Sequence, residues 1–294
     1  MLAGCQKILV HYTKGFSVTL MISDKKNLKI AAVVCVSLSA FLAVYRVFLL
    51  FYHIDPANGL YTDAKSGSIF SALLFVLLAI ALATYLFVRK YEFERPIKNE
   101  SVMVAFSSSI CALMTTAMFV YLVYGFIKDK SSFTFLSCAE AVLCIPSAIY
   151  FFLVCFRGAK IDKDAPATYS LLPLFPALFT AVRAIIIFID TTHQINASQR
   201  SFSLLTLIFI MMFFVTEAEF SVSRFLKGDK KPNQLAKLTA KYFALGLTST
   251  VLTTVVILSY LLVCAFWIFD SANLLHNIMY VCFGVYSLTR VLSV

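Results

Sequence analysis

Eight long apolar runs, separated by short polar connections, constrain this chain more than any other feature of its sequence. About 20 apolar residues are needed to cross a hydrocarbon core of about 30 Å as a helix. The runs are continuous rather than alternating, and a helix satisfies its own backbone hydrogen bonds in lipid, so helices are expected rather than barrel strands. We predict an all-α polytopic integral membrane bundle of about eight transmembrane helices. The predicted spans are Ile30 to Phe51, Ser68 to Val88, Val102 to Ile127, Phe133 to Phe156, Thr168 to Ile189, Ser203 to Val222, Phe243 to Ile268 and Leu274 to Leu292.

The connections alternate between many and few basic residues. Eighteen lysines and arginines lie in the amino-terminal tail and in the second, fourth and sixth connections, whereas the other connections hold four. Basic residues concentrate on the cytoplasmic side of membrane proteins. We therefore predict a multi-pass protein of the cell membrane with both termini in the cytoplasm. The net charge of +10 is explained by this bias, which attraction to anionic headgroups reinforces. It therefore requires no nucleic acid partner.

An internal similarity with a period near 137 residues divides the chain into two halves. Val44-Tyr45-Arg46, with Phe51 five residues on, is matched by Ala181-Val182-Arg183, with Phe188 five residues on. Leu113 to Thr116 is matched by Val251 to Thr254 at a shift of 138. We predict a tandem 4+4 repeat with both halves in one orientation, chance similarity between apolar helices being the alternative. The predicted parts are a cytoplasmic tail (1–29), a first membrane half (30–156), a cytoplasmic linker (157–167) and a second membrane half (168–294).

Three charged residues are expected at one depth within the predicted spans. Arg46 and Arg183 each lie six residues from the outer ends of their helices, about 9 Å deep, and Glu140 lies at nearly the same depth. Either one arginine pairs with Glu140 while the other binds an anion, or both share the carboxylate. We predict a ligand site for an anion here, which Tyr121 and Tyr124 would line. The alternatives are snorkelling of the arginines to the interface and a staple between helices.

A second charged group lies at the inner end of the sixth span and contains Glu217, Glu219 and Arg224. The segment Thr216 to Arg224 resembles the glutamate-bearing helix of membrane-embedded proteases that cut prenylated proteins. Its glutamates are not adjacent, however, and His276 lies at the opposite end of its span, too far for a shared general base. We assign no catalytic residue and interpret the group as a charge cluster at the inner boundary. Glu217 is expected to pair with one basic residue of the inner boundary, such as Arg224, Arg290 or Lys241.

Metal and cofactor sites are not predicted. Seven of the eight cysteines lie within the predicted spans at no metal-like spacing, which indicates packing residues. Three histidines fall on the outer side together with several aspartates, but no pair has the i, i+4 spacing of a helical metal site. These histidines are His53, His193 and His276.

The segment from Arg46 through His53-Ile54-Asp55-Pro56 to Gly59 resembles the first helix and outer loop of uncharacterised polytopic proteins of clostridial-type Firmicutes. This resemblance covers about 15 residues and implies no activity. From the buried charges we predict a non-enzymatic, permease-like or binding protein for an anionic or amphiphilic ligand in the outer half of the bilayer, with membrane lipids as partners. The alternative is an accessory subunit that docks a partner membrane protein. Polar residues converging inside the bundle favour the first, and a dry bundle favours the second.

Overall fold

The computed structural model describes residues 2–54, 61–89, 102–128, 134–157, 170–189, 197–225, 232–265 and 273–293. These residues are almost entirely helical, and the extended pairing found among them is one isolated bridge between Ile54 and Tyr61. The predicted all-α class is confirmed. In the described residues, six helices are long and apolar enough to cross a membrane, which fits a multi-pass integral membrane protein.

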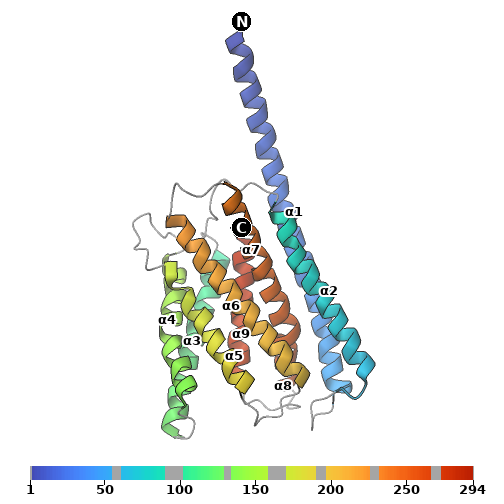
Figure 1. The fold of residues 1–294 in the computed structure, drawn as a ribbon, viewed down its shortest axis with the longest axis vertical. Coiled ribbons are helices and arrows are strands. Elements are labelled where there is room, and N and C mark those ends of the chain that lie inside the picture. The colour runs from blue at the N-terminus through green and yellow to red at the C-terminus, as the bar shows by residue number, and fades with distance from the viewer. Residues whose placement is uncertain are drawn as a thin grey trace.

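The helices form a bundle of roughly parallel and antiparallel rods (Figure 1). They are α1 (Leu2–Tyr52), α2 (Ala64–Val88), α3 (Val102–Lys128), α4 (Phe135–Arg157), α5 (Leu174–Ile189), α6 (Ala197–Phe225), α7 (Pro232–Leu252), the π-helical segment η3 (Thr253–Leu258), α8 (Ser259–Cys264) and α9 (Leu274–Leu292).

The two ends of the bundle differ in their connections. The end at which α2, α6 and α9 finish and α7 begins carries the connections rich in lysine and arginine, and we call it the basic end. Figure 1 places both chain ends toward this side of the bundle and shows the amino-terminal part of α1 projecting beyond it. At 51 residues, α1 is about 77 Å long, more than twice the thickness of a hydrocarbon core.

Two predicted spans have different bounds in the structure. The fifth was expected from Thr168, but α5 begins at Leu174, directly after Pro173, and has 16 residues. Proline suits the first helical turn, where its missing N–H leaves no helical hydrogen bond unmade, so Pro173 and Pro176 favour a helix start here. The seventh was expected from Phe243, but α7 begins eleven residues earlier, at Pro232. Crossing of the membrane by α5 and by α9, which are not among the six apolar helices, stays a prediction.

The rod formed by α7, η3 and α8 occupies the centre of the bundle. Its span Ala236–Cys264 is 72% buried, whereas α3 is 22% buried and lies at the edge against α4 and α9. Helix α7 packs against α2, α6 and α9, and small residues let these neighbours approach closely. Gly246 lies against Val291 and Phe213, and Gly284 of α9 lies against Thr253.

The packing of the two halves is unequal. Helix α2 packs along α7, but in the described part of the chain the corresponding pair, α6 and α3, has no comparable contact. Helices α3 and α4 pack together as α7 and α9 do, and α1 packs on α2 as α5 packs on α6. The tandem repeat is therefore not shown by the arrangement of the helices.

Replacing Gly284 by alanine should lower the thermal stability. An added Cβ would lie 2.0 Å from Oγ1 and 2.7 Å from Cβ of Thr253, so α9 would have to move away from the central rod. Overpacking of this kind costs about 1–3 kcal/mol. Gly125→Ala is the control, because its Cβ would meet nothing within 4 Å and alanine favours a helix. Thermal unfolding in detergent measures both, and a Gly284→Ala protein that melts like the parent would contradict the close crossing.

Candidate functional site

Glu140 joins three helices near the end opposite the basic end. Its Oε1 lies 3.0 Å from Nε2 of His276 on α9, and its Oε2 lies 3.7 Å from Nη1 of Arg183 on α5. The Glu140 side chain is 1% exposed and that of Arg183 is 11% exposed. Arg183 Nη2 also donates to Oδ1 of Asn273, the residue that precedes α9. A buried carboxylate and guanidinium thus match each other's charge, with a histidine as third member.

Arg46 lies in separate surroundings and has neutral partners. The residue is 0% exposed. Its Nη1 donates to the Tyr61 hydroxyl, and its Nη2 donates to Oε1 of Gln199 at 3.1 Å. The guanidinium carbon lies 4.5 Å from the ring centroid of Phe70 and 5.7 Å from that of Phe202. We call Tyr61, Phe70, Gln199 and Phe202 the Arg46 cage.

The cage is held by the first turns of two helices and by the residues before α2. Phe70 belongs to the first turns of α2, and Gln199 and Phe202 belong to the first turns of α6. Tyr61 precedes α2, and its ring rests on Gly67, where an added Cβ would lie 2.7 Å from the ring. Asp63 caps α2, because its side chain accepts a hydrogen bond from the backbone N–H of Lys65. This hydrogen bond lowers the pKa of the Asp63 carboxyl group. The cap and the glycine together fix Tyr61 over Arg46.

The two predicted tyrosines of the ligand site lie at the surface. Tyr121 is 48% exposed and Tyr124 is 61% exposed, both on the peripheral helix α3. Their role toward a ligand stays a prediction. The residues that sequence reasoning did not connect to the arginines are Tyr61, Phe70, Gln199, Phe202, Asn273 and His276.

At the basic end, Glu217 pairs with Arg290, one of its three expected partners. Both Nε, at 2.7 Å, and Nη2 of Arg290 donate to Oε1 of Glu217, which also accepts from the Tyr286 hydroxyl at 2.9 Å. The Tyr286 hydroxyl in turn lies 2.7 Å from that of Tyr150. Glu217 is 2% exposed, so the pair links α6 to α9 inside the bundle.

Glu219 and Arg224, the other members of the predicted inner cluster, do not join this buried network. Glu219 is 47% exposed and accepts from Nζ of Lys241 at 2.9 Å. The side chain of Arg224 lies outside the described residues. Within the described ranges, no group of three metal-binding side chains is found.

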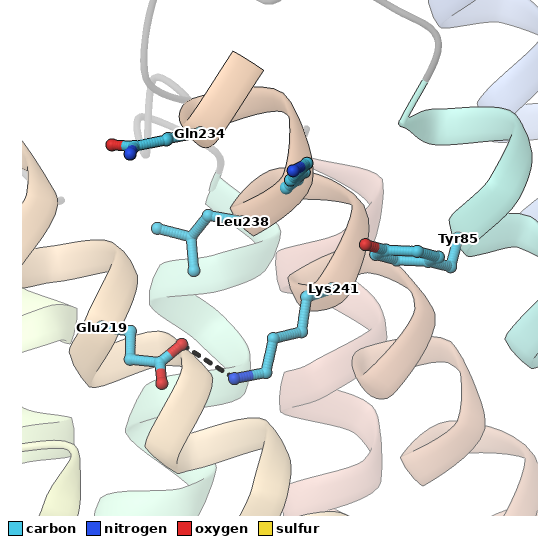
Figure 2. A pocket seen from close by; sticks show the side chains of 6 residues that line it. Tyr85, Glu219, Gln234, Leu238 and Lys241 are labelled. Atoms are coloured by element: carbon cyan, nitrogen blue, oxygen red, sulfur yellow. Dashed lines mark hydrogen bonds and ion pairs between the residues drawn. The ribbon is translucent and has the colours of Figure 1, made fainter. Parts of the chain in front are cut away.

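A cavity of about 530 Å³ opens at the basic end beside the Glu219–Lys241 pair. Figure 2 shows Tyr85 reaching from α2 toward α7, and the side chain of Lys241 extending from α7 to Glu219 on α6. We call this space the basic-end cavity. Its lining residues are Tyr85, Glu219, Gln234, Lys237, Leu238 and Lys241.

Comparison of the chain with protein families, with curated proteins and with solved structures finds no match. The resemblance of the Arg46 segment to polytopic proteins of Firmicutes therefore stays a prediction, and the function is argued from the geometry of the chain itself.

Replacing Glu217 by leucine should strongly destabilise the protein, because it leaves the Arg290 guanidinium buried without a carboxylate. Breaking a buried pair in this way costs about 3–5 kcal/mol. The double variant Glu217→Leu with Arg290→Met removes both charges and should melt closer to the parent. Thermal unfolding in detergent provides the measurement.

Glu219→Leu is the matched control for this pair. It breaks an exposed ion pair two residues away, and exposed pairs contribute about 0–1 kcal/mol, so its melting temperature should stay near that of the parent. If the Glu217 and Glu219 variants lost equal stability, burial would not be what distinguishes the two pairs.

Proposed function

We propose that this protein is a permease-like or binding protein for an anionic ligand, and that the ligand binds Arg46. The observation that carries the proposal is the contrast between Arg46, which is buried, and Arg183, which is nearly buried. Arg183 faces the Glu140 carboxylate, whereas the Arg46 cage supplies two neutral hydrogen-bond acceptors and aromatic rings. The charge of Arg46 is thus the one that an incoming anion would match.

The physical cost of an unmatched charge supports this role. A charged side chain in the interior of a membrane helix costs about 2.5–3.5 kcal/mol on insertion scales. Aromatic faces offset part of it through cation–π attraction. Arg46 Nε is buried and has no hydrogen-bond partner in the described part of the chain, so one donor of the planar fork is unused. A carboxylate or phosphate oxygen suits that donor better than a neutral acceptor does.

Tyr61 supports a route of entry to this site. It lies in the turn before α2, is partly exposed, and places its hydroxyl on Nη1 of Arg46. If the Tyr61 side chain moved away from Gly67, the Arg46 guanidinium would become accessible from the end of the bundle opposite the basic end. In this proposal the tyrosine hydroxyl occupies the position of a ligand oxygen when the site is empty of anion.

Polar side chains inside the bundle favour permeation over simple docking. Thr250 on α7 lies 3.0 Å from Ser287 on α9, and Ser107 on α3 lies 2.7 Å from Thr289. The central rod changes from α-helix to π-helix at Thr253–Leu258, and such segments are frequent at functional sites. An accessory subunit would show an exposed apolar face, as α3 does, but lipid covers a face of that kind equally well.

The binding test uses inorganic phosphate and acetate as probes of the two oxyanion classes, at constant ionic strength. One of them should raise the melting temperature of the detergent-solubilised protein in a saturable way, since a ligand that binds the native state stabilises it. Arg46→Gln should abolish that shift. Tyr61→Phe should strengthen it, because the competing hydroxyl is removed from Nη1. A shift that survives Arg46→Gln would contradict the proposal.

Arg200→Gln is the control for the Arg46 variant. Arg200 follows Gln199, lies at the same end of the bundle and donates to the Phe188 carbonyl, so the same chemical change is made outside the cage. Its response to the probe should equal that of the parent. Equal loss in both variants would indicate a general effect of charge at this end of the bundle.

We also propose that α5 and α9 cross the membrane, that the two halves are a tandem repeat and that both termini are cytoplasmic. The imbalance of 18 against 4 basic residues supports this topology. Reporters fused after residues 60, 130, 195 and 272 should read outside, and those after 95, 162 and 232 should read inside. An outside signal at Lys231 would overturn the orientation.

A further inference from the structure

The basic-end cavity lies at the depth of the lipid headgroups. Tyr85 is three residues before the end of its span at Val88, and Glu219 is three residues before Val222. Lys237 and Lys241 are one and five residues after the start of theirs at Ala236. At 1.5 Å per residue, these side chains start within about 8 Å of the span ends. The cavity is therefore at the membrane boundary and not in the hydrocarbon core.

The walls of the cavity carry a surplus of donors and of positive charge. Lys237 and Lys241 stand against the single carboxylate of Glu219, which leaves a formal charge of +1. The Gln234 amide and the Tyr85 hydroxyl add neutral donors. Lys241 and Glu219 are 43% and 47% exposed, so their pair is screened by water and weak. An oxyanion in the cavity can therefore replace Glu219 as the ion-pair partner of Lys241.

The rim of the cavity is apolar on the α2 side. Leu82 and Leu86 flank Tyr85 on that helix at i−3 and i+1, and they are 40% and 61% exposed. Since α2 is long and apolar enough to span a membrane, Leu82, one turn deeper than Tyr85, and Leu86, beside it, offer an acyl chain an apolar surface next to the cavity. A volume of about 530 Å³ accommodates a headgroup, within the range of small-molecule sites.

We propose that the basic-end cavity binds the phosphate of an anionic phospholipid, with Lys237, Lys241 and Gln234 around the phosphate and the acyl chains along Leu82 and Leu86. Phosphate is the chemistry that two ammonium groups and an amide recognise, and juxtamembrane lysines attract anionic lipids. The apolar rim selects a lipid over free phosphate. The site is independent of Arg46, which lies near the opposite end of the bundle.

The test measures binding of short-chain dioctanoyl phosphatidylglycerol to the delipidated protein by native mass spectrometry. Dioctanoyl phosphatidylcholine and inorganic phosphate are the comparison probes. Phosphatidylglycerol should bind most tightly, because it alone combines net negative charge with acyl chains. Inorganic phosphate binding as tightly as phosphatidylglycerol would overturn the lipid as the source of the phosphate, and phosphatidylcholine binding as tightly would overturn the requirement for charge.

Two sets of variants move the affinity in opposite directions. Lys237→Gln with Lys241→Gln should weaken phosphatidylglycerol binding by roughly 25-fold, about fivefold for each lysine near an anionic headgroup. Glu219→Gln should tighten it severalfold, because Lys241 is released and a like charge is removed from the cavity. A misfolded protein cannot show this gain. Lys65→Gln, an exposed lysine at the opposite end, should bind like the parent. Unchanged binding in both cavity variants would overturn the proposal.

Discussion

A charge enclosed in an apolar bundle is costly unless an opposite charge matches it there, and two matched contacts organise the structure around α9. His276 at one end of α9 contacts Glu140 of α4, and Arg290 near the other end contacts Glu217 of α6. These two residues are 14 positions apart, or about 21 Å along the helix. Removing one partner of such a pair is costly because the other charge stays buried. The two contacts therefore tie α9 to α4 near one end and to α6 near the other.

Between these two charged contacts, most hydroxyl side chains donate to a backbone carbonyl one turn earlier in their own helix, and the helices pack closely. Thr248 donates to the Ala244 carbonyl and Thr253 donates to the Ser249 carbonyl, each within the same helix. Fewer hydroxyls act across helices, such as Ser259 of α8, which also donates to the Ala43 carbonyl of α1. Small residues and self-satisfied hydroxyls let backbones approach where bulky side chains would not. The mainly apolar interior thus holds polar side chains and is still closely packed.

The two arginines show how similar sequence contexts acquire different roles. Arg46 and Arg183 lie in similar sequence contexts 137 residues apart, yet one faces aromatic rings and neutral acceptors while the other faces a carboxylate. The difference comes from the neighbours, since α5 packs on α4 while α1 packs on α2 and the central rod. The proposed anion site depends on this asymmetry, because a repeat in which both arginines were neutralised would hold no unmatched cation.

The sequence by itself determined the helical class and most of the membrane-spanning segments, because apolar length and composition are local properties. It also placed Arg290 among three possible partners of Glu217, since basic residues at that depth are few, and the structure selects Arg290. Only the tertiary structure decided which arginine meets Glu140, that His276 joins them, and that Tyr61, Gln199 and two phenylalanines surround Arg46. Depth along a helix can be counted from sequence, but the direction in which a side chain points around it follows from helix packing. That packing depends on contacts between segments more than 100 residues apart, such as Arg46 with Gln199 and Glu140 with His276.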